Sequence, residues 1–211
     1  MTALDLRARR IVWGFLVGVT VLEAALIMMS FPDILSRPDR FEHYTFVPLG
    51  GPAAWLLAAA TTIAYIAYAA SRSPVIRRHM LAPGTWGAFR GVRLIAFAMA
   101  FVTGFFEEAF FRKFLMTIVM HHGYGPVAQV AISAGVFGVA HGIWAVAGGH
   151  PRAAIGPMLS TGILGGLLAI AFLLGGRSLA PCVASHIVIN LFLEPWLIIT
   201  SATRAWGKKT A

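Results

Sequence analysis

The chain alternates between long apolar stretches and short polar ones. Six apolar segments stand out, at about residues 11–31, 47–70, 92–120, 126–147, 157–175 and 179–199. Each is close to or longer than the ~20 apolar residues that a helix needs to cross the ~30 Å hydrocarbon layer of a bilayer. The pattern therefore predicts an all-α fold, a polytopic transmembrane bundle of about six spans.

Composition supports the membrane class. Of the 211 residues, 58% are hydrophobic and only 12% are charged, whereas about a quarter of a soluble protein is charged. The segment at 11–31 is too long for the apolar region of a signal peptide, which covers about 7–15 residues. We therefore interpret it as the first membrane helix, in a multi-pass protein of the cell membrane.

The basic residues indicate an orientation. If the six segments all span, eleven of the seventeen Lys and Arg residues fall on the side of both termini and three on the other side. Basic residues gather on cytoplasmic loops, so both termini are expected in the cytoplasm. The formal charge of +9 is spread in short clusters without the aromatic-interleaved basic face of nucleic-acid binders, and no nucleic-acid partner is expected.

The third segment carries two adjacent carboxylates and a guanidinium in aromatic surroundings, Phe105 to Lys113. Ionisable groups within hydrocarbon cost a few kcal/mol each and tend to face a bundle interior or a wet cavity. Glu108 and Arg112 are spaced i, i+4 and can pair on one helix face. Glu107 is turned by about 100° from Glu108, which makes it the candidate general base. The alternative is a structural ion-pair cluster.

Two later segments carry further polar residues at the same spacing. Phe137 and His141 share one face of the fourth segment, and His186 and Asn190 share one face of the sixth. Each pair alone could simply hydrogen-bond between helices. Counting ~1.5 Å per residue from the intervening turns, however, brings Glu107, His141 and Asn190 to about one depth. One polar layer is therefore expected among the last four helices.

Three motifs in this order, Glu-Glu-x-x-x-Arg, Phe-x-x-x-His and His-x-x-x-Asn, resemble the CPBP family of intramembrane proteases. This is the group of CAAX prenyl endopeptidases and bacteriocin-processing enzymes, whose bacterial members are also labelled abortive-infection proteins. The resemblance divides the chain into two N-terminal helices without a diagnostic motif (1–91), a catalytic four-helix core (92–199) and a short basic tail (200–211).

The resemblance implies a role for each residue. Glu107 would activate water with help from His141, Glu108 and Arg112 would stabilise the site, and His186 with Asn190 would bind the oxyanion. The substrate would be a peptide or protein that is embedded in the lipid bilayer or tethered to it by a lipid. A prenylated protein, a peptide precursor and a C-terminal sorting tag are all compatible with the resemblance.

Three alternatives stay open. Glu107, Glu108, His141 and His186 could instead hold zinc, which binds Glu and His with one position left for water. Because Arg112 beside the carboxylates disfavours a cation and no His-Glu-x-x-His motif is present, a mechanism without metal or cofactor is preferred. The other two are a proton-coupled transporter, which buried Glu, Arg and His would suit, and a silent scaffold or immunity protein.

Overall fold

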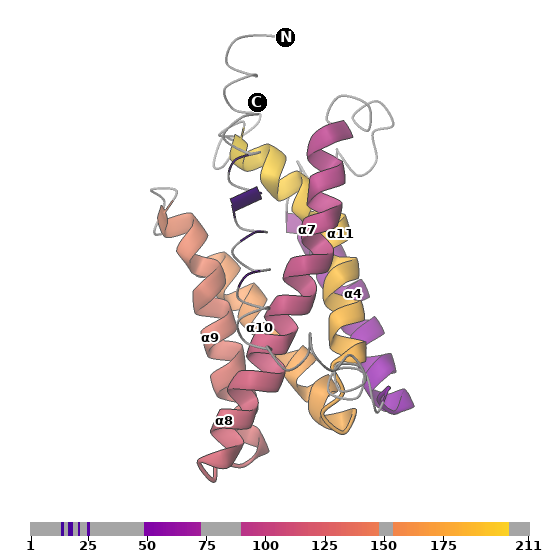
Figure 1. The fold of residues 1–211 in the computed structure, drawn as a ribbon, viewed down its shortest axis with the longest axis vertical. Helices are drawn as coiled ribbons and strands as arrows, with labels where there is room; N and C mark the ends of the chain where they lie inside the picture. Colours follow the sequence, from indigo (N-terminus) through magenta and orange to yellow (C-terminus); the bar gives the residue numbers. More distant parts are fainter. Residues whose placement is uncertain are drawn as a thin grey trace. The chain divides into compact units, whose positions relative to one another are not determined.

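The computed structural model describes residues 49–72, 90–147 and 154–202, together with isolated positions between residues 14 and 25. Within these ranges the chain is all-helical, as predicted, and contains no β-strand. The elements, in chain order, are α4 (Pro52–Arg72), α7 (Arg90–Glu108), the π-helix η1 (Ala109–Leu115), α8 (Met116–His121), α9 (Pro126–Ala147), α10 (Ile155–Leu174) and α11 (Ala180–Ala202) (Figure 1).

The helices follow the predicted apolar segments closely. The segment predicted at 126–147 coincides with α9, and the one at 92–120 corresponds to α7, η1 and α8 in direct succession. The first predicted segment, residues 11–31, lies outside the described residues apart from isolated positions, as does the basic tail after residue 202.

Two helices of the described part of the chain, α4 and α10, are long and apolar enough to cross a membrane. Shorter apolar stretches, Pro126–Gly142 and Ala180–Leu193, lie within α9 and α11. The total of six spans stays a prediction.

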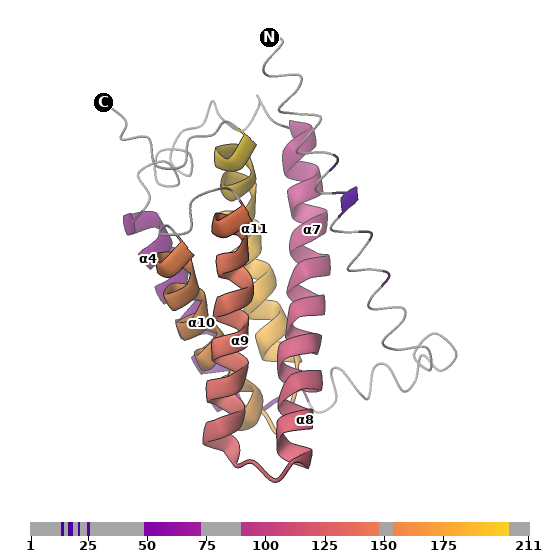
Figure 2. The ribbon, with the colours of Figure 1, turned by 90° about the vertical axis from the view of Figure 1, so that its left-hand side faces the viewer.

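Tight turns reverse the chain between successive helices. Gly123, with φ +82°, lies between α8 and α9, and Pro126 is the first residue of α9; Figure 2 shows this short connection. Glycine adopts positive φ without a Cβ penalty, and proline is favoured in the first turn of a helix. Between α10 and α11 two successive residues have positive φ, Gly176 at 66° and Arg177 at 67°.

The chain divides into two compact units. The first comprises Met1–Pro32, Ala64–Phe106 and His186–Ala211, and the second comprises Asp33–Ile63 and Glu107–Ser185. The second unit thus holds η1, α8, α9 and α10, with the start of α11 and the first part of α4. The first holds most of α7 and α11.

Glycines bring α9 and α10 close together in the second unit. A Cβ added at Gly138 would lie 2.5 Å from the carbonyl oxygen of Met158 and 3.1 Å from Cα of Gly162. A Cβ at Gly142 would collide with the side chain of Met158, and one at Gly165 would lie 3.0 Å from Cδ1 of Phe137. Small residues allow such backbone contact in membrane bundles. Helices α9 and α10 therefore pack closely at these glycines.

Candidate active site

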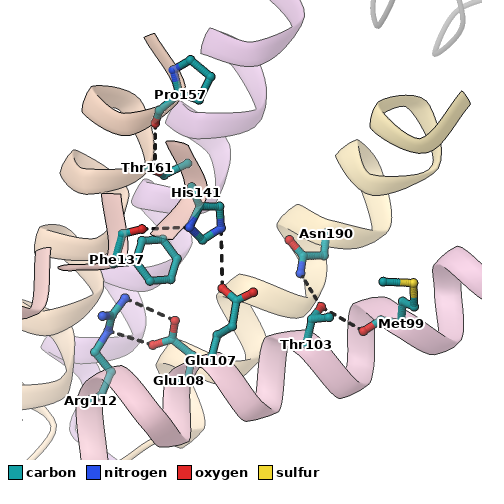
Figure 3. A network of polar contacts seen from close by, with 10 residues as sticks. All are labelled: Met99, Thr103, Glu107, Glu108, Arg112, Phe137, His141, Pro157, Thr161 and Asn190. Atoms are coloured by element: carbon teal, nitrogen blue, oxygen red, sulfur yellow. Dashed lines mark hydrogen bonds and ion pairs between the residues drawn. The ribbon is translucent and has the colours of Figure 1, made fainter. Parts of the chain in front are cut away.

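A buried ion pair joins the end of α7 to η1 in the second unit. Arg112 Nε lies 2.9 Å from Glu108 Oε2, and Arg112 Nη2 donates a hydrogen bond of 3.3 Å to Glu108 Oε1. Both side chains are completely buried, with 0% exposure. The predicted pairing of Glu108 with Arg112 is confirmed, and both oxygens of this carboxylate face the guanidinium (Figure 3).

Helix α9 supplies further contacts to the guanidinium. Arg112 Nη1 donates a hydrogen bond of 2.8 Å to Ser133 Oγ, and Ser133 in turn donates to the carbonyl oxygen of Phe111 at 3.1 Å. The guanidinium carbon lies 5.0 Å from the centre of the Phe137 ring. A cation at that distance is attracted by the face of an aromatic ring. Arg112 is thereby held from three directions.

The stretch that carries Arg112 is a π-helix, Ala109–Leu115. A π-helix bonds each N–H to the carbonyl five residues earlier, is rare, and often occurs at functional sites. It begins directly after the two glutamates and faces the side chains of α9. The local geometry of the site therefore departs from a regular helix at the point where its charges lie.

Glu107 faces His141 from α9. Glu107 Oε2 lies 3.6 Å from His141 Nε2, and the two side chains are 20% and 27% exposed (Figure 3). The proximity expected from counting residues through the turn is observed. Unlike the neighbouring Glu108, this carboxylate is open in part to its surroundings.

A second contact sets the orientation of the His141 ring. Nδ1 lies 2.9 Å from the carbonyl oxygen of Phe137, one helical turn earlier. A carbonyl oxygen only accepts, so Nδ1 must carry the proton. In the neutral ring Nε2 then presents its lone pair on the side of Glu107.

Two acceptors 3.6 Å apart suit a shared water molecule. Hydrogen bonds from water are about 2.8 Å long, so one water could donate to Glu107 and to His141 together. A carboxylate next to a neutral imidazole is an arrangement that can remove a proton from that water.

One of the four candidate zinc ligands, Glu108, is already engaged by Arg112. A catalytic zinc site uses three protein ligands and a water, and the two oxygens of Glu108 are engaged by Arg112 at 2.9 and 3.3 Å, which leaves three of the four candidates. In the described residues, no group of three or more His, Cys, Asp or Glu side chains is arranged to hold a metal ion.

The other two predicted residues lie in the first unit. His186 is 2% exposed, and Asn190 follows one turn later in α11. Asn190 Nδ2 donates a hydrogen bond of 3.0 Å to Thr103 Oγ1 of α7. The side-chain amide of Asn190 is thus held by a partner in α7.

Sequence reasoning missed Ser133 and Thr103. Both are small polar residues in apolar helices, each at four-residue spacing from a residue of the motifs: Ser133 precedes Phe137, and Thr103 precedes Glu107. Spacings of four place residues on one helix face. That signal was present, but serine and threonine are common in membrane helices and are not distinctive alone.

Comparison with known proteins gives one match. Residues 89–192 match the family model described as type II CAAX prenyl endopeptidase, Rce1-like. Over these residues, just under half of the chain, the protein is similar to the Rce1-like family. No curated protein and no solved structure matches the chain.

The Rce1-like match contains all six predicted site residues, from Glu107 to Asn190, and begins just before α7. It confirms the family indicated by the three motifs. The family comprises membrane proteins with protease activity of the CAAX endopeptidase type, and the described helices include two that could cross a membrane. Helix α4 lies outside the match.

Proposed function

We propose that this protein is an intramembrane endopeptidase in which Glu107 and His141 activate water to hydrolyse a peptide bond. The observation that carries the proposal is the 3.6 Å approach of Glu107 Oε2 to His141 Nε2, together with the bond that commits His141 Nδ1 to Phe137. Amide hydrolysis requires an activated water, and these two acceptors can take its hydrogens.

The reaction proceeds by direct attack of water. Glu107 accepts a proton as the water oxygen bonds to the scissile carbonyl carbon, while His141 Nε2 orients the water through its other hydrogen. His186 and Asn190 stabilise the oxyanion that forms, a contribution of ~10²–10³ in kcat for one donor in other enzymes. Glu107 then returns the proton to the amide nitrogen, the C–N bond breaks, and a carboxylic acid and an amine are released; the acid afterwards loses its proton to solvent.

Glu108 and Arg112 act as a fixed electrostatic support. Their ion pair is fully buried, and breaking such a pair leaves a charge without compensation. With Glu108 engaged by Arg112, Glu107 is the carboxylate left for proton transfer. This division of roles uses no metal ion.

The substrate belongs to the membrane. The family acts on CAAX prenyl proteins, which are tethered by lipid, and a site on apolar helices suits a lipid-tethered or membrane-embedded peptide. We place the protein in the cell membrane with six spans and cytoplasmic termini, because the basic residues divide eleven to three between the two sides.

The test compares purified wild-type and Glu107→Ala protein, each incubated with host membranes, by mass spectrometry of new peptide termini. We expect a set of termini that requires Glu107 and persists with a chelator present. Identical sets of peptide termini from the wild type and Glu107→Ala would contradict the protease proposal and leave the transporter and silent-scaffold alternatives. Loss of the termini on chelation alone would restore the zinc mechanism.

A further inference from the structure

Thr103 is buried at the contact between α7 and α11, and no motif of the family resemblance includes it. It is 5% exposed and lies in the first unit together with Asn190. Two hydrogen bonds of the Thr103 hydroxyl define its role: Oγ1 lies 2.9 Å from the carbonyl oxygen of Met99 and 3.0 Å from Asn190 Nδ2 (Figure 3).

The direction of these bonds follows from donor counting. A hydroxyl has one hydrogen, and a backbone carbonyl can only accept it. Thr103 therefore donates to Met99 and must accept from Asn190. The side-chain amide of Asn190 is thereby held with its NH₂ group, and not its oxygen, toward Thr103.

This orientation matters for an oxyanion. An NH₂ group has two hydrogens, and Thr103 uses one, which leaves the other for a ligand. A reversed amide would offer its oxygen in place of the NH₂ group, and two acceptors repel. The hydrogen bond to Thr103 therefore selects the orientation in which the Asn190 NH₂ group can donate to an oxyanion, and disfavours the one in which the amide oxygen would repel it.

The backbone next to Thr103 fixes the separation of the two helices. A Cβ added at Gly104 would lie 2.9 Å from Cγ1 of Ile187 and 3.2 Å from its backbone nitrogen. Ile187 follows His186 directly in α11. Close contact at Gly104 therefore sets the distance across which Thr103 reaches Asn190.

We propose that Thr103 is a positioning residue, which holds the Asn190 amide as a hydrogen-bond donor to the oxyanion of the reaction. The inference rests on the proposed function. Thr103 acts through Asn190 and has no contact of its own with the reacting atoms.

The test is a double-mutant cycle with the full chain reconstituted in proteoliposomes. Host membranes supply the substrates. The measured quantity is the rate at which Glu107-dependent peptide termini appear. Thr103→Val keeps the shape and removes the hydroxyl, and we expect a loss of about tenfold, the value of one hydrogen bond. Asn190→Ala is expected to lose about a hundredfold. Thr103→Val should then add nothing to Asn190→Ala, because its effect passes through that amide.

Two controls separate positioning from structure. Thr103→Ser restores the hydroxyl and should recover most of the rate. Thr161, a buried residue of α10, makes the same kind of bond, from Oγ1 to the carbonyl of Pro157 at 2.7 Å, so Thr161→Val should leave the rate unchanged.

Three outcomes would overturn the inference. Thr103→Val could cleave at the wild-type rate, the double variant Thr103→Val with Asn190→Ala could lose the product of the two single losses in rate, or Thr103→Ser could fail to recover the rate. Failure of the proposed function looks different. In that case Glu107→Gln gives the same termini as the wild type, and the positioning role falls with it.

Discussion

Arg112 and Glu108 form a completely buried ion pair. Arg112 Nε lies 2.9 Å from Glu108 Oε2, and both side chains are 0% exposed. One helical turn separates them, and Ser133 and Phe137 of α9 enclose the guanidinium. The pair connects the end of α7 to the π-helix and to α9. The two glutamates therefore differ in environment although they are neighbours in sequence.

Removing one partner of this pair is expected to destabilise the fold strongly. Glu108→Gln or Arg112→Met should each lower the free energy of unfolding by about 3–5 kcal/mol, because a buried charge is left without its partner. The double variant, Glu108→Gln with Arg112→Met, should be more stable than either single one. Thermal unfolding in detergent measures this, and equal losses in all three variants would contradict the ion-pair account.

Ser133→Ala is expected to loosen Arg112. The serine accepts from Arg112 and donates to the carbonyl of Phe111, so its loss should cost about 1–3 kcal/mol through unsatisfied buried groups. Ser160→Ala is the matched control, since Ser160 makes one bond, to the carbonyl of Pro157 at 3.2 Å. If both variants melt at the same temperature, the hydrogen bonds of Ser133 to Arg112 and Phe111 do not contribute specifically to stability.

Helix packing predicts opposite effects for two glycines of α9. A Cβ at Gly138 would lie 2.5 Å from the carbonyl oxygen of Met158, whereas a Cβ at Gly135 would meet nothing within 4 Å. Gly138→Ala should lower the melting temperature. Gly135→Ala should leave it unchanged or raise it, because alanine is favoured over glycine in a helix by about 1 kcal/mol. A tolerated Gly138→Ala would argue against the close α9–α10 contact.

His141→Ala is expected to lower the rate of Glu107-dependent cleavage by about 10²–10⁴-fold, the range for a positioned acid or base. The chain offers a matched control in His122, whose Nδ1 also lies 2.9 Å from the carbonyl one turn earlier but whose side chain is exposed. His122→Ala should cleave at the wild-type rate. Equal losses for the two histidines would point to an effect on the fold.

The helices could be predicted because apolar segments of this length leave the backbone few alternatives in a bilayer. Counting residues from the turn between the third and fourth apolar segments placed Glu107 and His141 at one depth. The i, i+4 spacing of Glu108 and Arg112 was enough to predict their pairing.

Other features depend on contacts that a sequence does not display. The π-helix Ala109–Leu115 has no composition of its own, since its phenylalanines and leucine suit an α-helix equally well. The bond of His141 Nδ1 to Phe137 and the link between Thr103 and Asn190 depend on rotamers and on helix separation. Ser133 and Thr103 became visible only as partners of charged or amide groups.

The central claim is that Glu107 activates the water that hydrolyses the substrate. Its most direct test is the cleavage rate of Glu107→Gln in proteoliposomes, because glutamine keeps the shape of the side chain and removes the basic oxygen. The substrate is the peptide whose new terminus depends most strongly on Glu107. The account predicts a loss of about 10²-fold or more with an unchanged melting temperature. Cleavage by Glu107→Gln at the wild-type rate would contradict it.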